Sequence, residues 1–251
     1  MNNKTTNMPK LFEVGGCVRD ELLGVHTNDI DFTFVLNDLN QTVEQGFIQM
    51  QTFLKDNKFK IFLETPDCFT IRAMFPQDHT HQGLVADFVM ARKEVGVIPG
   101  TRRPILELGT LEDDLIRRDF TLNAMAKDLD GNIIDLFNGK KALEDKILIT
   151  PLDPITTFMD DPLRMIRALR FSITKGFTIH PSVWKAIFTP GLLDKLEEVV
   201  SQERIREELQ KMFKHDTIAA MRLLSKIDAI EPRLMEIMFK GAMWLIPSTK
   251  Q

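Results

Sequence analysis

The sequence lacks most features that mark secreted, membrane-spanning and zinc-binding proteins. It has 251 residues with only 2 cysteines, no tyrosine and no apolar run of the length that crosses a bilayer, about 18 residues or more. Its polar N-terminus has no signal-peptide core. Cys17 and Cys68 form no C-x-x-C pair and have no obvious histidine partner, which excludes a zinc site and indicates a reducing compartment. We therefore expect a cytoplasmic protein with no membrane contact.

An excess of positive charge is also missing. The chain has 32 Lys and Arg against 36 Asp and Glu, a net charge of −4 and a pI of about 5.8. No global basic field draws it to nucleic acid, so any RNA contact must come from a local patch. Without tyrosine, base stacking would use phenylalanine, Trp184, Trp244 or arginine planes. The length allows one large domain or two modest ones with a real core.

The stretch after the first predicted strand has the composition of a phosphate-binding turn. Gly15 and Gly16 follow the apolar run Leu11–Val14, and a backbone without Cβ atoms can turn sharply and approach a ligand closely. We expect Cys17–Leu23 to start a short helix whose free N–H groups suit phosphate oxygens, with Arg19 adding a charged fork. The expected ligand is a polyphosphate.

An acidic strand follows this turn. Residues 29–36 alternate between polar and apolar side chains, which is typical of a half-buried strand. The period of two places Asp29 and Asp31 on one face, where they can share divalent ions, and oxygen ligands together with substrate phosphates suit Mg²⁺. Two such ions clamp the attacking and leaving oxygens of an in-line displacement. Taken singly, the glycines could be an ordinary turn and the aspartates a solvent-exposed strand end.

Taken together, the order Gly-Gly, Val-Arg-Asp, Leu-Leu-Gly and Asp-x-Asp in residues 15–31 closely resembles the signature of the tRNA nucleotidyltransferase and bacterial poly(A) polymerase family. This family is the class II branch of the DNA polymerase beta-like nucleotidyltransferases. The resemblance implies an α+β fold, with a catalytic head of residues 1–150 built on a mixed sheet flanked by helices. An all-helical neck of residues 151–251 follows, and the active site is expected in the cleft between them.

Residues Arg117–Ala126 resemble the second signature of this family. The resemblance assigns Arg118, Asp119 and Asn123 to the sugar and phosphates of an incoming nucleotide, alongside Gly15, Gly16 and Arg19 of the first signature. By charge pattern alone, this cluster would be the solvated face of a helix.

The third metal-binding carboxylate of the family corresponds to Asp87, in a later predicted strand. The resemblance thus implies that Asp29, Asp31 and Asp87 are the catalytic, metal-holding residues. The alternative for Asp87 is a solvent-exposed aspartate at a strand end.

Asp160–Phe171 resembles the family's Glu-Asp-x-x-Arg motif, with Asp160 in the glutamate position. The resemblance implies that Asp161 and Arg164 form a protein template that reads the base edge of CTP or ATP, which requires acceptors and donors in fixed geometry. We expect this segment to lie on one helix, which buries the side formed by Leu163, Ile166, Leu169 and Ile173. The opposite, charged face carries Asp160, Asp161, Arg164 and Arg167, and we group Arg167 with the nucleotide-binding residues. The alternative is a surface ladder of i,i+3 and i,i+4 ion pairs, worth little in stability.

Several other segments carry weaker expectations. His79 and His81 read as a solvated loop and not as metal ligands, because no cysteine or further histidine lies nearby. Residues 97–109 read as a mobile loop that resembles, by position and by Pro99-Gly100, the loop linked in CCA-adding members to the switch from C to A addition. The remaining expectations are helices over 40–54 and 111–127, strands over 59–63, 68–75 and 84–91, a hairpin around Asp130-Gly131, and structural third and fifth signatures at 135–139 and 203–209.

The resemblance implies a template-independent RNA nucleotidyltransferase that uses Mg²⁺ to add or repair the 3′-terminal CCA of tRNA from CTP and ATP. Addition of the terminal A alone and poly(A) synthesis stay open, because poly(A) polymerases share the head motifs. A nucleotide- or RNA-binding subunit that needs a partner chain also stays open. Family members continue into body and tail domains that grip tRNA, and 251 residues leave no room for them. Three alternatives stay open: a minimal enzyme with a weak grip on RNA, a truncated or split protein whose partner chain or oligomer replaces these domains, and a substrate smaller than tRNA.

Overall fold

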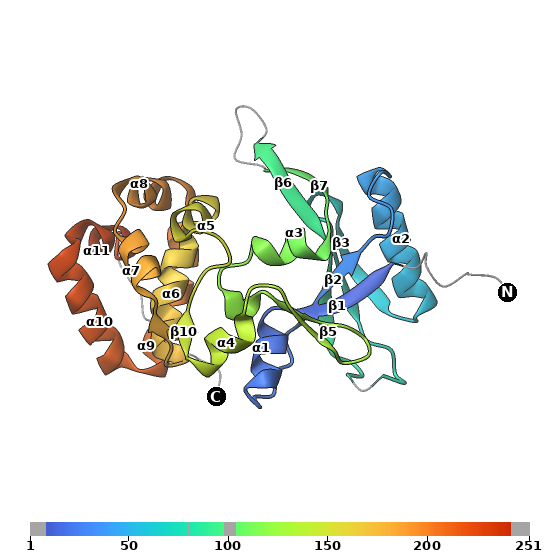
Figure 1. The fold of residues 1–251 in the computed structure, drawn as a ribbon, viewed down its shortest axis with the longest axis horizontal. Helices are drawn as coiled ribbons and strands as arrows, with labels where there is room; N and C mark the ends of the chain where they lie inside the picture. The colour runs from blue at the N-terminus through green and yellow to red at the C-terminus, as the bar shows by residue number, and fades with distance from the viewer. Residues whose placement is uncertain (1–8, 80, 98–103, 242–251) are drawn as a thin grey trace. The chain divides into compact units, whose positions relative to one another are not determined.

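The computed structural model describes residues 9–79, 81–97 and 104–241. Contacts within the chain group it into two compact units, Met1–Lys141 and Ala142–Gln251, which are described separately below (Figure 1). The position expected for the change from head to neck, residue 151, falls inside the second unit. Among the described residues, no helix combines the length and the apolar character needed to cross a membrane.

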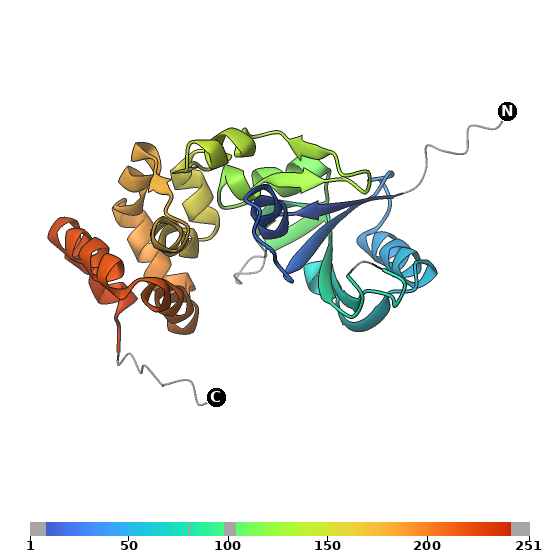
Figure 2. The same ribbon diagram turned by 90° about the horizontal axis from the view of Figure 1, so that it is seen from below.

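A seven-stranded mixed sheet forms the centre of the first unit. Its order is β3-β4-β5-β2-β1-β8-β9, with β2 and β5 parallel and all other neighbours antiparallel (Figures 1 and 2). The strands are β1 Lys10–Val14, β2 Ile30–Val35, β3 Lys60–Thr65, β4 Thr70–Met74, β5 Val85–Met90, β8 Met125–Lys127 and β9 Ile133–Asp135. This arrangement confirms the predicted mixed sheet and the hairpin that joins β8 to β9.

The two faces of the sheet are covered differently. Helix α2, Val43–Asp56, packs on one face, where Phe53 meets Phe34 of β2 with ring centroids 5.4 Å apart (Figure 1). Thr42 caps this helix in a reciprocal capping box with Gln45. On the other face, Phe12 and Val14 of β1 join a buried cluster with residues 115, 124 and 126. Helix α1, Gly16–Leu22, leads from β1 toward β2.

The predicted helix over 111–127 is wrong beyond its first two turns. Helix α3 ends at Ile116, a 3₁₀ turn covers Thr121–Asn123, and the chain then enters β8. Every residue from 119 to 126 is buried, so no solvent-exposed helical face exists there. Pairing of β8 with β1 outweighs local helix propensity in this segment.

The predicted loop over 97–109 also needs correction. Residues 104–108 form β7, which pairs antiparallel with β6, Arg92–Val97, in a separate two-stranded sheet (Figure 1). Alternating side chains around Ile105 suit a strand despite the flanking proline and glycine. Pro99, Gly100 and the pair Arg102-Arg103 lie outside the described residues.

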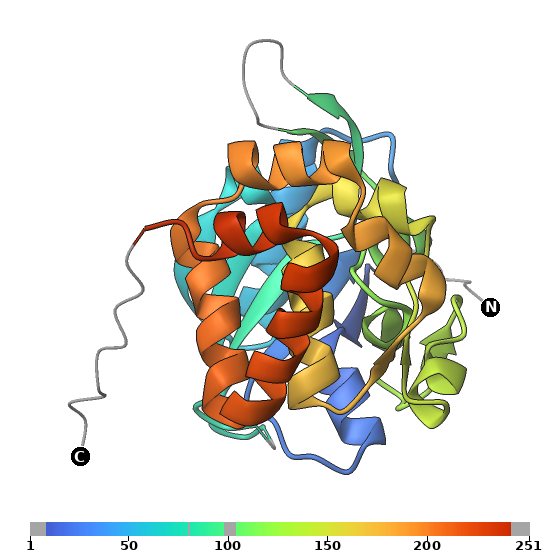
Figure 3. The same cartoon turned by 90° about the vertical axis from the view of Figure 1, so that its left-hand side faces the viewer.

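In residues 142–241 the second unit is helical apart from one short parallel strand pair, β10 Ile147–Leu148 with β11 Thr178–Ile179. Its helices are α5 Pro154–Asp160, α6 Leu163–Thr174, α7 Pro181–Ile187, α8 Pro190–Val199, α9 Gln202–His215, α10 Thr217–Ile230 and α11 Pro232–Met238, while α4, Gly139–Glu144, spans the junction with the first unit. Figure 3 shows α10 and α11 (red) beside α9, which in turn packs on α6.

The charged motif at residues 160–171 does not lie on one helix, contrary to the prediction. Helix α5 ends at Asp160, Asp161 has an extended backbone with φ −140°, and α6 starts at Leu163. Pro162 explains the break, because the residue before a proline is pushed out of the helical region. The apolar side of α6 is buried as predicted, with Leu169 fully covered.

Candidate functional site

Strand register brings the three predicted metal-site aspartates to one region of the first unit. Asp31 of β2 is the direct partner of Asp87 in the parallel neighbour β5, and exposed Asp29 immediately precedes β2. The pKa of Asp31 is raised to about 6. Burial is the largest cause, the charge of Asp29 is the next, and the charge of Asp87 adds to the rise. The three carboxylates therefore repel one another electrostatically, and a bound cation would reduce this repulsion.

This donor set suits a hard divalent cation, since it consists of carboxylate oxygens only. Asp87 is already engaged, however. Nε and Nη2 of Arg72, on β4, donate to its Oδ1 and Oδ2 over 2.6 Å each. Within the part of the chain that the structure describes, no group of three or more Asp, Glu, His or Cys side chains is arranged to hold a metal ion. The free pair Asp29 and Asp31 fits the cation, and Asp87 fits it once Arg72 releases its oxygens.

Gly15 holds the turn between β1 and α1 in a conformation that needs glycine. Its φ is 79°, and a Cβ at this position would lie 2.6 Å from Nη1 of Arg118. The missing side chain thus lets the Arg118 guanidinium approach the turn. The predicted partners Gly15 and Arg118 are therefore adjacent.

Arg118 is oriented by a carboxylate that the motif comparison did not select. Its Nη2 donates to Oδ2 of Asp114 over 2.9 Å, one helical turn earlier, and the Thr33 hydroxyl donates to the same oxygen. Burial raises the pKa of Asp114, but the Arg118 charge and these two hydrogen bonds outweigh burial and hold the pKa below its ordinary value. Asp114 is 6% exposed, so it is a buried, ionised anchor. Nε of Arg118 is buried and has no hydrogen-bond partner among the described residues.

A second network joins three more predicted residues. Arg19 donates in bidentate fashion to Asp20 over 2.9 and 2.8 Å, and its Nη1 donates to Oδ1 of Asn123 over 2.6 Å. The Asn123 amide donates to Asp119, which also accepts the N–H of Phe120. Arg19, Asp119 and Asn123 are all at least nine-tenths buried. The structure thus brings both signature motifs together, through a network that locks the turn after β1 to the turn after α3.

In the second unit, the predicted base-reading pair lies at the junction of α5 and α6. Asp161 accepts the Leu163 N–H on Oδ1 and pairs through Oδ2 with Nη2 of Arg204, on α9, at 3.1 Å. Nη1 of Arg164 donates to the carbonyl of Thr157 over 3.1 Å. Both side chains are half-buried, and each is fixed by a neighbouring helix.

Arg167 points into a different cluster. Its Nη1 lies 3.7 Å from Oε1 of Glu208, which also binds Arg170 and lies 3.6 Å from Lys211. Glu208 is only 4% exposed, so these cations compensate a buried charge. The ion pair of Arg167 with Glu208 thus links α6 to α9.

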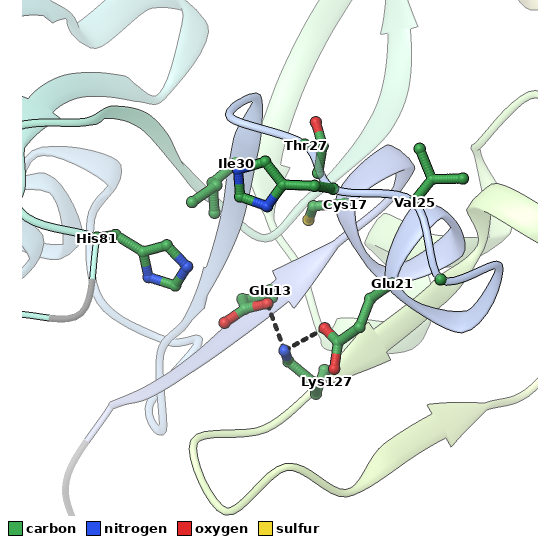
Figure 4. A pocket seen from close by; sticks show the side chains of 10 residues that line it. Glu13, Cys17, Glu21, Val25, Thr27, Ile30, His81 and Lys127 are labelled. Atoms are coloured by element: carbon green, nitrogen blue, oxygen red, sulfur yellow. Dashed lines mark hydrogen bonds and ion pairs between the residues drawn. The ribbon is translucent and has the colours of Figure 1, made fainter.

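A cavity of about 400 Å³ opens on the sheet face opposite the aspartates. Glu13 lines it, whereas the next residue along β1, Val14, is the partner of Asp31 on the other face. Figure 4 shows the Lys127 ammonium between the carboxylates of Glu13 and Glu21, with His81 across the pocket. Because Lys127 is neutralised, this cavity offers no surplus positive charge for phosphate.

Sequence reasoning missed several charged residues that hold predicted site residues, among them Arg72, Asp114 and Arg204. The i,i+4 spacing of Asp114 and Arg118 was a usable signal in a predicted helix. Arg204 lies inside the fifth signature, but nothing in the sequence indicates that it pairs with Asp161, 43 residues earlier. Arg72 could not be found this way, because its partnership with Asp87 follows from strand register.

The mixed sheet, the register of its aspartates and the glycine turn define a nucleotidyltransferase-type head. Residues 11–149 match the Poly A polymerase head domain family, and residues 176–239 match a family described as the probable RNA and SrmB-binding site of polymerase A. The first match covers more than half of the chain, so the chain belongs to the Poly A polymerase head domain family.

Individual relatives resemble this chain in sequence, and one of them also in its solved structure. The tRNA nucleotidyltransferase cca2 of Schizosaccharomyces pombe is 34% identical over 80% of this chain and 42% of its own length. A Multifunctional CCA protein of Janthinobacterium is 35% identical over 88% of this chain and 50% of its own. The Bacillus stearothermophilus CCA-adding enzyme, solved in complex with CTP, superimposes with a TM-score of 0.67 at 30% identity, over 87% of this chain and 48% of that one. The chain thus spans about half the length of the relatives it matches.

Proposed function

We propose that this chain transfers nucleoside monophosphates from CTP and ATP to the 3′-hydroxyl of tRNA, adding or repairing the terminal CCA. The observation that carries the proposal is the register of Asp31 against Asp87, with Asp29 beside them, in a head that also holds Arg118 against the Gly15 turn. Paired carboxylates near a free guanidinium donor suit nucleotidyl transfer. The names of the relatives, which are CCA-adding enzymes and tRNA nucleotidyltransferases, support the same choice.

In this proposal Asp29, Asp31 and Asp87 hold Mg²⁺. When bound there, the ion supplies charge neutralisation for the reacting phosphate and the leaving pyrophosphate. Arg118 binds phosphate oxygens, since Asp114 fixes its Nη2 while its Nη1 lies against the Gly15 turn. The network of Arg19 holds the turn that carries Gly15 in place.

Base selection is assigned to Asp161 and Arg164. Their acceptor and donor groups are fixed by Arg204 and by the α5 carbonyl of Thr157, which is the preorganisation that reading a base edge needs. Arg167 acts in this scheme through its ion cluster with Glu208, by holding α6 in place.

The direct test is incorporation of labelled CTP and ATP into tRNA that lacks its CCA end, with Mg²⁺. Asp29→Ala should abolish incorporation, and Asp130→Ala, which removes an exposed aspartate from the β8–β9 turn, should leave it unchanged. Tails of many adenylates would assign poly(A) synthesis instead. Binding of CTP without any transfer would favour the subunit that needs a partner chain.

Charge reversal at Arg164 tests the template. Arg164→Glu should change the ratio of CTP to ATP incorporation more than it lowers the total, because this side chain takes no part in the displacement. Equal loss with both nucleotides and an unchanged preference would leave Arg164 as a structural contact of Thr157.

A further inference from the structure

Arg72 directly occupies a predicted metal ligand, and among the described residues it is the one cation whose ion pair does so. It lies on β4 in direct register with Asp87 of β5, which is in turn in register with Asp31 of β2, so all three side chains project from the same face of the sheet. The guanidinium binds both carboxylate oxygens of Asp87 at 2.6 Å. Its side chain is 46% exposed, so nothing in the core forces it into this position.

The charges around Arg72 explain this placement. The hydrogen bonds and the charge of Asp87 raise the pKa of Arg72, and Asp29 and Asp31 contribute to the same rise. Three carboxylates and one guanidinium leave two negative charges, which a single divalent cation neutralises. Without Arg72 the same site would carry three negative charges and would bind a cation more tightly.

We propose that Arg72 is a built-in counter-ion of the carboxylate site: it occupies Asp87 while no cation is bound, releases it when a cation arrives, and thereby lowers the cation affinity of the free protein. This inference rests on the ion-binding role proposed above for the three aspartates. Its consequence is a site that fills poorly until additional negative charge, such as nucleotide phosphates, offsets the guanidinium.

The alternative is that Arg72 orients Asp87 for the cation, in which case its loss would weaken binding. The two roles predict opposite signs for the same measurement. A guanidinium a few ångströms from a divalent ion, in surroundings close to water, lowers affinity by about tenfold. That change is large enough to separate the two roles.

The test measures Mn²⁺ binding to the full chain without nucleotide or RNA. Binding is monitored through the electron paramagnetic resonance signal of the Mn²⁺ that stays free. Arg72→Met should bind Mn²⁺ about tenfold more tightly, whereas Arg72→Lys, which keeps the charge, should stay within about twofold of the unchanged protein. Arg233→Met is the matched control, because Arg233 has a similar exposure of 42% and pairs with acids of the second unit. Binding by Arg72→Met that is unchanged or weaker overturns the inference.

Asp31→Ala separates this inference from the proposed function. Mn²⁺ binding that survives Asp31→Ala would show that the ion sits elsewhere, which overturns both. Binding that depends on Asp31 and tightens in Arg72→Met upholds the counter-ion role even in a chain that transfers no nucleotide. Mn²⁺ binding that depends on Asp31 but is no tighter in Arg72→Met would overturn the counter-ion role of Arg72. It would leave the assignment of the ion to the aspartates unchanged.

Discussion

Replacement of Asp114 by asparagine is expected to destabilise the first unit, because it removes the buried charge that pairs with Arg118. Asp114 is 6% exposed and accepts from both Arg118 and Thr33 on one oxygen. Asparagine is nearly the same size and can still accept from the Thr33 hydroxyl. The substitution therefore removes the charge and leaves the Arg118 cation without its counter-ion.

The magnitude follows from the burial of both partners. Breaking a buried ion pair by removing one member costs about 3–5 kcal/mol, and the 23% exposure of the Arg118 side chain places this pair at the lower end, about 3 kcal/mol. If the cost comes from the stranded cation, Arg118→Met should recover much of it in the Asp114→Asn background. The double-mutant cycle should give a coupling of about 2 kcal/mol or more.

Urea unfolding, monitored by far-UV circular dichroism, measures these free energies. The control is Glu112→Gln, which replaces an exposed acid on the same helix. The folded-state pKa of Asp114 lies below its unfolded value, so its stabilisation is present above about pH 4 and is lost as the pH falls through the folded pKa. The gap between the unchanged protein and Asp114→Asn should narrow in acid. Costs that simply add in the double variant, or a gap independent of pH, would refute the reasoning.

Three further outcomes are expected. Burial and a neighbouring carboxylate raise the pKa of Asp31 from 3.8 to about 6. Asp31→Asn should therefore stabilise the EDTA-treated protein by about 3 kcal/mol at pH 7.5 and by less than about 1 kcal/mol at pH 4. An equal gain in stability at both pH values, measured by thermal melts, would contradict this. Gly15→Ala should cost more unfolding free energy than Gly131→Ala, since both have positive φ but only at Gly15 would the Cβ meet a guanidinium nitrogen, and similar costs would rule out that contact. Glu208→Gln should lower the unfolding free energy of the second unit by about 3 kcal/mol, measured by tryptophan fluorescence. Glu207→Gln, at the exposed neighbouring position, should change it little. Equal losses in the two variants would show that the buried ion cluster does not stabilise this unit.

Local pattern was sufficient for much of the first unit. Alternation along residues 29–36 predicts a half-buried strand, and β2 confirms the strand, with Phe32 and Phe34 buried. The predicted exposure of its polar face is wrong, because Thr33 is only 1% exposed and Asp31 is half-buried. The apolar spacing along residues 40–54 predicts the helix that appears as α2. These elements were readable because their side-chain periodicity matches the face that each one buries.

Other elements depend on contacts between distant segments. Residues 117–127 look helical, but the pairing of Met125–Lys127 with β9 and β1 decides their structure. The contact between Arg72 and Asp87 exists only because β4 and β5 pair in one particular register. The break at Asp161 was readable from Pro162, yet its support by Arg204, 43 residues later, was not.

The most direct test of the central claim is to sequence the 3′ ends of tRNA after incubation with the protein, Mg²⁺ and all four nucleoside triphosphates. The account predicts that tRNA ending before its CCA gains C, C and A in that order and then stops, and that Asp31→Ala yields unextended ends. Extension that is equally efficient with Asp31→Ala, or ends of a different sequence, would contradict it.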